Sequence, residues 1–182
     1  MNPLQKMLGQ KKVTLLFGVL LLLNLLLFNI AVFPGSTPEI TAAAPDQTIP
    51  DMMGLYSPED VYDFLTEITA EGRESYQFMH LTTDLAFPLI YGLFLVSLLS
   101  RLFLALEGLP RWLPFLGLIP AGFDLAENFT LVFITSRFPA FLPGLTHLAQ
   151  FFTLAKFLGL AGVVLLIVFL AIKMRTRSRS AL

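Results

Sequence analysis

The chain has 182 residues, of which 55% are hydrophobic and 14% charged, and its formal net charge is −1. A water-soluble domain of this composition would expose large apolar patches, so the composition indicates a membrane protein. No cysteine is present, which excludes disulfides, thiolate catalysis and cysteine-ligated zinc or iron–sulfur centres.

The chain contains four long apolar runs. Each is long enough to cross a hydrocarbon core of about 30 Å, which takes about 20 helical residues. They are Val13–Phe33, Leu81–Leu104, Trp112–Ile134 and Leu148–Ile172. The first run follows three lysines, as a signal peptide would, but it is too long for one and lacks a cleavage site. We therefore predict an all-α integral membrane protein with four transmembrane helices in a bundle, forming a single membrane domain over residues 1–182.

The basic residues predict an orientation with both termini cytoplasmic, because Lys and Arg concentrate on the cytoplasmic side. This orientation leaves only Arg73 and Arg137 outside. The side chains that it places inside are Lys6, Lys11, Lys12, Arg101, Arg111, Lys173, Arg175, Arg177 and Arg179. We therefore expect a multi-pass protein of a cell membrane, either the plasma membrane or a bacterial-type inner membrane.

The segment between the first two runs, residues 34–80, is hydrophilic and is extracytoplasmic in this orientation. Its Pro- and Gly-rich beginning predicts irregular chain. Ser57 as N-cap and Pro58 at the first helical position then predict a short amphipathic helix over about 58–71, which Gly72 is expected to end. Its apolar positions recur at helical spacing and are Val61, Phe64, Leu65 and Ile68. The segment is strongly acidic, so nucleic acid is not an expected partner.

Ionisable side chains interrupt the third and fourth runs. Asp124, Glu127 and Asn128 lie in the third run, and Lys156 lies in the fourth. A rise of 1.5 Å per residue places Glu127 and Lys156 at matching depth, so we predict an ion pair between them. Asp124 lies nearer the midplane and is expected to keep a proton beside an ionised Glu127. Because such groups are costly in hydrocarbon, they usually mark a functional site.

Small residues on the third run predict close helix packing. Gly117, Ala121, Asp124 and Asn128 follow 4-3-4 spacing and so lie on one helical stripe. Pro120 lacks a backbone donor and can kink this helix.

A polar stripe also follows the second run at 4-3-4-4-3 spacing. Its members are Arg73, Gln77, His80, Asp84, Pro88 and Tyr91. Since such a stripe cannot comfortably face lipid, we expect it to face the acids and the lysine of the last two runs. The candidate catalytic residues are Asp124, Glu127 and Lys156. The candidate substrate-binding residues are Asp84, His80, Tyr91, Asn128, Gln77 and Arg73.

These residues predict an outward-opening polar pocket that binds or converts a lipid-like or isoprenoid-like molecule, with acid–base chemistry at the carboxylates. The alternative is a non-enzymatic subunit or assembly factor of a larger membrane complex. Ala155 and Gly159 form a small-x-x-x-small pair that suits either a partner helix, a homo-oligomer or internal packing. A third possibility is passage of protons or ions through an oligomer.

The two histidines, His80 and His147, are the residues on which a metal or haem site would depend. His80 and Asp84 have the i, i+4 spacing of two ligands on one helix. No recognised ligand motif surrounds either histidine, and no phosphate loop or nucleotide fingerprint is present. The sequence therefore predicts no metal site and assigns no cofactor.

Overall fold

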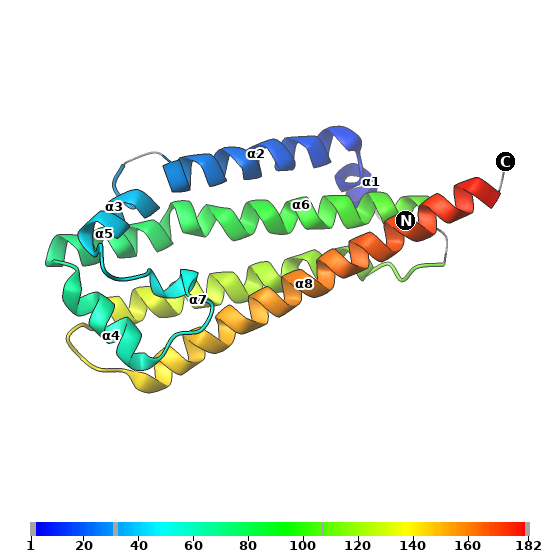
Figure 1. Ribbon diagram of the computed structural model, residues 1–182. Coiled ribbons are helices and arrows are strands. Elements are labelled where there is room, and N and C mark those ends of the chain that lie inside the picture. The colour runs from blue at the N-terminus through cyan, green and yellow to red at the C-terminus, as the bar shows by residue number, and fades with distance from the viewer. Residues whose placement is uncertain (1–2, 31–32, 107, 181–182) are drawn as a thin grey trace.

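The computed structural model describes residues 3–30, 33–106 and 108–180, and the description excludes the side chains of Asp51 and residues 177–180. Ala31 and Val32 of the first predicted span, and the side chains of Arg177 and Arg179, therefore lie outside the described residues. The described chain is all-helical and contains no strand. Its elements (Figure 1) are α1 Pro3–Leu8, α2 Lys11–Ile30, α3 Thr37–Ala43, the 3-10 helix η1 Pro50–Met52, α4 Pro58–Glu67, α5 Ala70–Leu81, α6 Thr83–Ala105, the 3-10 helix η2 Leu113–Gly117, α7 Leu118–Ser136 and α8 Pro143–Ser180.

Four helical stretches of the described chain are long and apolar enough to cross a membrane, which confirms the predicted all-α architecture. They are Lys11–Ile30, Ala70–Ala105, Leu113–Ser136 and Pro143–Thr176. α6 packs against both α2 and α7, and α7 packs against α8. The two ends of the chain lie at one end of the bundle, and α3 and α4 lie at the other (Figure 1).

The second and third membrane-length stretches are each divided. Thr82 has φ −126° and ψ −90°, which separates α5 from α6. The third stretch begins as η2 and continues as α7 from Leu118. Pro120 lies in the first turn of α7, where backbone N–H groups have no intrahelical partner to lose, so its missing N–H removes no hydrogen bond from the middle of this helix.

The predicted start of the amphipathic helix is confirmed in α4. Ser57 N–H donates to Asp60 Oδ2 at 2.7 Å, and Asp60 N–H donates to Ser57 Oγ at 3.1 Å, which forms a capping box. These hydrogen bonds, from the Ser57 backbone first, lower the pKa of Asp60 below its usual value. Asp60 therefore supports this helix start as a carboxylate at neutral pH, and the support is lost only as the pH falls through that lowered pKa.

The predicted end of this helix is wrong. α4 ends at Glu67, and Thr69 then caps α5, with Gly72 N–H donating to the Thr69 hydroxyl at 3.1 Å. Gly72 thus lies in the first turn of the next helix instead of ending the previous one. A Cβ there would lie 3.1 Å from Ile68 Cβ, so a glycine lets the two helices turn closely at this point.

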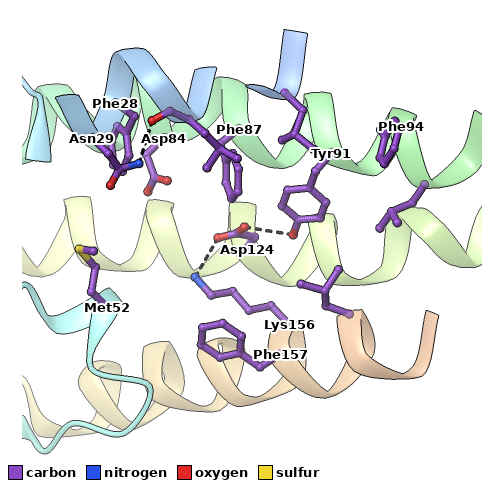
Figure 2. Close-up of a pocket in the computed structure, with 14 residues that line it drawn as sticks. Phe28, Asn29, Met52, Asp84, Phe87, Tyr91, Phe94, Asp124, Lys156 and Phe157 are labelled. Atoms are coloured by element: carbon purple, nitrogen blue, oxygen red, sulfur yellow. Dashed lines mark hydrogen bonds and ion pairs between the residues drawn. The ribbon is translucent and has the colours of Figure 1, made fainter. Parts of the chain in front are cut away.

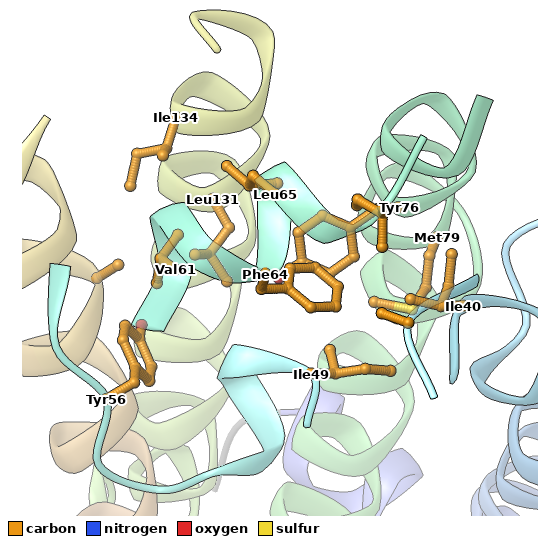
Figure 3. Close-up of a cluster of buried hydrophobic side chains, with 13 residues drawn as sticks. Ile40, Ile49, Tyr56, Val61, Phe64, Leu65, Tyr76, Met79, Leu131 and Ile134 are labelled. Atoms are coloured by element: carbon orange, nitrogen blue, oxygen red, sulfur yellow. The ribbon is translucent and has the colours of Figure 1, made fainter. Parts of the chain in front are cut away.

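The 34–80 segment folds onto the bundle through an apolar cluster that we call the end core (Figure 3). Its members are Ile40, Ala44, Ile49, Tyr56, Val61, Phe64, Leu65, Ile68, Tyr76, Met79, Leu131, Ile134 and Ala149. The predicted apolar face of α4 is therefore buried against α5, α7 and α8. α3 and η1, which the sequence predicted as irregular chain, contribute or border the same cluster.

A second apolar cluster, the bundle core, lies nearer the chain ends. It consists of Tyr91, Leu95, Leu99, Leu102, Leu106, Leu113, Ala121, Val163 and Leu170. Here α6 and α7 approach closely, because a Cβ on Gly117 would lie 2.8 Å from Leu95 Cβ and one on Gly92 would lie 2.9 Å from Ala121 Cβ. The predicted small-residue stripe is thus the contact between these two helices.

Candidate functional site

The ionisable side chains lie in a layer between the end core and the bundle core. On α7, Asp124 and Glu127 come between Ala121 of the bundle core and Leu131 of the end core. On α8, Lys156 comes between Ala149 of the end core and Val163 of the bundle core. Apolar side chains therefore pack on both sides of this layer and exclude water from most of the layer.

Lys156 joins both acids of α7 in what we call the ion triad. Its Nζ lies 2.6 Å from Glu127 Oε2 and 3.0 Å from Asp124 Oδ1. The Glu127 side chain is fully buried, and those of Asp124 and Lys156 are 5% and 13% exposed. The predicted Glu127–Lys156 pair is therefore present, and Asp124 shares the same ammonium, which the depth argument did not predict.

Neutral hydrogen-bond donors complete the ion triad. The Tyr91 hydroxyl of α6 donates to Asp124 Oδ2 at 3.0 Å (Figure 2). The Thr153 hydroxyl of α8 lies 2.5 Å from Glu127 Oε1 and 3.1 Å from the Tyr56 hydroxyl. Each of the four carboxylate oxygens of Asp124 and Glu127 thus has a partner, as buried charges require.

Asp84 forms a second polar group at the start of α6. Its Oδ2 lies 2.8 Å from Nδ1 of the fully buried His80, so the imidazole N–H donates to the carboxylate. The Asn128 side chain of α7 donates to the backbone carbonyl of Asp84 at 2.9 Å. These contacts fix the start of α6 against α7 beside the ion triad.

The predicted stripe on the second span divides at Thr82. Asp84, Pro88 and Tyr91 are buried and face the bundle, as expected. Arg73 instead donates to the carbonyls of Leu65 and Ile68 at 2.7 and 2.8 Å, and its guanidinium lies 4.3 Å from the centre of the Phe138 ring. Arg73 therefore closes the end of α4 and is not part of the site.

A pocket of about 470 Å³ borders the polar layer between α2 and α8. Its lining residues are Leu21, Leu25, Phe28, Asn29, Met52, Asp84, Phe87, Tyr91, Phe94, Leu95, Asp124, Lys156, Phe157 and Leu160. Asp84, Tyr91 and Asp124 are buried and form the floor, whereas Leu25 and Phe157 are exposed at the rim. The pocket thus combines apolar walls with a few convergent polar groups, which is the usual form of a small-molecule site.

Several candidate residues lie behind the pocket. Glu127, His80 and Asn128 do not line it, although each contacts a residue that does. Gln77 is partly buried on α5 and Arg73 lies further away, and neither lines the pocket. Of the candidate residues, those that line the pocket are therefore Asp84, Tyr91, Asp124 and Lys156.

Sequence reasoning missed the contribution of Thr153 and the aromatic walls. Thr153 lies three residues before Lys156, so helical periodicity places both on one face of α8, and this signal could have identified it. Nothing in the sequence links Tyr56, in the connection after η1, to Thr153. The aromatic walls come from three different helices and include Phe28, Phe87 and Phe157.

The two histidines differ in burial. His80 is fully buried, whereas His147 is exposed near the start of α8. Within residues 3–30, 33–106 and 108–180, no group of three or more His, Asp or Glu side chains is arranged to hold a metal ion. The polar groups of the pocket are thus carboxylates, an ammonium, a phenol and an amide.

The ion triad predicts an unequal response to removal of its members. Lys156→Met leaves two buried carboxylates without their cation, whereas Glu127→Met leaves Lys156 paired with Asp124. Losing one partner of a buried ion pair costs about 3–5 kcal/mol. We expect Lys156→Met to lower the thermal unfolding midpoint in detergent more than Glu127→Met does, and the double variant to be more stable than Lys156→Met alone.

Lys173→Met is the matched control, because Lys173 is an exposed lysine of the same helix. Its unfolding midpoint should equal that of the unaltered protein. Additive effects of Lys156→Met and Glu127→Met in the double variant would contradict the triad, because residues in contact should be coupled.

Comparison with known proteins assigns no family to this chain. No family model, no curated protein and no solved structure matches it. What the pocket binds must therefore be inferred from its own side chains.

Proposed function

We propose that this chain is a multi-pass protein of a cell membrane that binds a lipid-like or isoprenoid-like molecule in the pocket between α2 and α8. The observation that carries the proposal is a cavity of about 470 Å³ with apolar walls and a polar floor formed by Asp84, Tyr91 and Asp124, with Lys156 beside it. A hydrocarbon chain suits the walls, and a polar head group suits the floor. The volume lies within the range of known small-molecule sites, about 300–1,000 Å³.

The exposed rim supports access from the bilayer. Leu25 of α2 and Phe157 of α8 are 40% and 48% exposed and lie on membrane-length helices, so they would contact acyl chains in a bilayer. Met52 of η1 lines the pocket on the side of the 34–80 segment (Figure 2). We therefore propose lateral access between α2 and α8 in place of the outward opening expected from the sequence.

Acid–base conversion of the ligand would depend on Asp124. This carboxyl borders the pocket, accepts a hydrogen bond from Tyr91 and contacts the Lys156 ammonium. Glu127 lies behind Lys156 and would act as a positioning residue that balances its charge. In this proposal Asp124 exchanges a proton with the ligand, and Tyr91 and Lys156 orient it.

A second candidate function, a subunit of a larger membrane complex, is favoured by an apolar groove between α8 and the start of α7. The groove has a volume of about 190 Å³ and is lined by Leu116, Ile119, Gly159, Gly162, Val163 and Leu166. A Cβ on Gly159 would lie 3.5 Å from Pro120, so this glycine already serves internal packing, whereas one on Gly162 would meet nothing within 4 Å. A helix of a membrane partner, or of a second copy, could approach at Gly162.

Ion passage gains no support from the half of the bundle nearer the chain ends. Ser97 donates to the Leu8 carbonyl at 2.6 Å and lies 2.8 Å from the Thr14 hydroxyl. These polar groups thus join α6 to the N-terminal helices.

Filling the pocket should remove its ligand. Leu25→Trp adds an indole to the pocket wall, whereas Leu27→Trp adds one to a side of α2 that does not line the pocket. We expect native mass spectrometry of gently extracted protein to show a bound lipid or isoprenoid for the unaltered chain and for Leu27→Trp, and none for Leu25→Trp.

Equal recovery of ligand from both tryptophan variants would contradict the proposed site. A stoichiometric second protein in the same spectra, with no bound small molecule, would favour the subunit function instead.

The proposed orientation predicts the location of the connection between α6 and α7. Because basic residues flank this connection, we expect residues 106–110 to lie in the cytoplasm. A reporter enzyme that is active only in the cytoplasm should therefore work when inserted there and should fail when inserted at 45–48, before η1. The opposite pattern would reverse the orientation.

A further inference from the structure

The polar floor of the pocket has more acid than base. Asp84, Asp124 and Glu127 lie within this layer, and the Lys156 ammonium contacts Asp124 and Glu127. The other basic side chain of this layer is His80, whose Nδ1 lies 2.8 Å from Asp84 Oδ2, so three carboxyl groups lie beside one lysine and one imidazole. Ionised carboxylates in a poorly hydrated layer need a compensating cation or a proton. The site is therefore electrostatically prepared for positive charge.

Lys156 is poorly placed to receive an anion. Its ammonium already contacts Glu127 at 2.6 Å and Asp124 at 3.0 Å, and its side chain is 13% exposed. A phosphate or carboxylate head group would have to displace one of these carboxylates or lie beside them. Like charges at close range in a layer of low dielectric are strongly unfavourable.

Asp84 offers a carboxylate to the pocket at a point away from Lys156. Its side chain is nine-tenths buried, with 10% exposed, and it borders the cavity while His80 supports one oxygen from behind. Figure 2 shows this side chain directed into the pocket, beside Phe87 and across from Met52. A cation here would complete the charge balance of the floor.

Aromatic rings surround this position. Phe28 of α2 and Phe87 of α6 line the pocket on the same side as Asp84, and Phe157 lines it from α8 (Figure 2). Ring faces attract cations, and each such contact contributes about 0.5–2 kcal/mol when it is desolvated. The rings can also pack against a hydrocarbon chain, so the same wall can contact both the head group and the chain of an amphiphile.

We infer, resting on the proposed function, that the ligand is a cationic amphiphile: an apolar chain with a protonated amine that binds Asp84 between the aromatic rings. Asp124 and Lys156 then contact the first part of the chain or a hydroxyl group near the amine. Lipids with an anionic phosphate as their only charge are excluded by the same charges that attract the amine.

A matched series of ligands tests this inference. Protein in phosphatidylcholine nanodiscs is titrated with dodecylamine, dodecanol and dodecyl phosphate by calorimetry, with empty nanodiscs as the blank. A charged hydrogen bond contributes about 1.5–3 kcal/mol, so the amine should bind at least about tenfold more tightly than the alcohol. Dodecyl phosphate should bind more weakly than either.

Asp84→Asn locates the cation. This variant should bind dodecylamine at least about tenfold more weakly and dodecanol nearly unchanged, since only the charge contact is lost. Asp63→Asn is the matched control, because Asp63 is an exposed acid of α4 that does not line the pocket, and it should bind as the unaltered protein does.

The outcomes separate this inference from the proposed function. Equal affinity for amine and alcohol, or tighter binding of the phosphate, would overturn the cationic head group while keeping the pocket as a lipid site. An amine preference that survives Asp84→Asn would overturn the role of Asp84. Saturable binding of none of the three would reject the proposed function itself. The order of the three affinities in the unaltered protein tests the charge of the head group even where Asp84→Asn does not fold.

Discussion

The contact on which this structure depends is the Lys156 ammonium held between the carboxylates of Asp124 and Glu127. Placing an Asp, Lys or Arg at the centre of a membrane helix costs about 2.5–3.5 kcal/mol for each residue. The triad offsets part of this cost by sharing one cation between two acids. It also fixes the register of α8 on α7, because a shift of one helical turn, about 5.4 Å, would separate all three groups.

Hydrogen bonds extend this constraint to the remaining parts of the protein. Tyr91 connects Asp124 to α6, and Thr153 brings Glu127 and Tyr56 together, so the connection after η1 is tied to the same layer. The end core lies on one side of the layer and the bundle core on the other. Each acid is therefore held by a different structural neighbour, although both share Lys156.

The pocket follows from how α2 is placed. This helix packs on α6, whereas α8 packs on α7, so α2 and α8 stand on opposite sides of the polar floor. α2 is largely exposed along its length, and Thr14 is its buried residue, so it contributes apolar surface to the pocket while burying little itself. A wall of this kind suits exchange with lipid better than a closed core would.

Much of the fold could be predicted from the sequence because its main signals are local. Hydrophobic runs predicted the four membrane-length helices, and Ser57 with Pro58 predicted the start of α4. The end of α4 was misplaced because Thr69 begins a new helix three residues before the glycine that was expected to stop the old one. The position at which α4 ends depends on whether Thr69 caps a new helix or Gly72 stops the old one, and on packing against Ile68.

The site was predictable in part for the same reason. Helical rise alone identified the Glu127–Lys156 contact, and spacing placed Asp84 and Tyr91 on the inner face of α6. The shared contact with Asp124 depends on the rotation of α8, which the sequence does not define. Arg73 was assigned to the site because the stripe was treated as one helix, whereas the break at Thr82 separates it.

Photo-crosslinking in lipid vesicles tests most directly whether a ligand occupies the pocket between α2 and α8. A long-chain alcohol that carries a diazirine at its chain terminus would label residues wherever that terminus resides, and the labelled peptides can be identified by mass spectrometry. We expect labels on the facing sides of residues 21–29 and 156–160. These labels should be lost when excess unlabelled alcohol competes and when Lys156 is replaced by Met. Labels spread evenly over exposed positions such as Leu165 and Phe169, and unaffected by competitor, would show that no pocket between α2 and α8 holds a ligand.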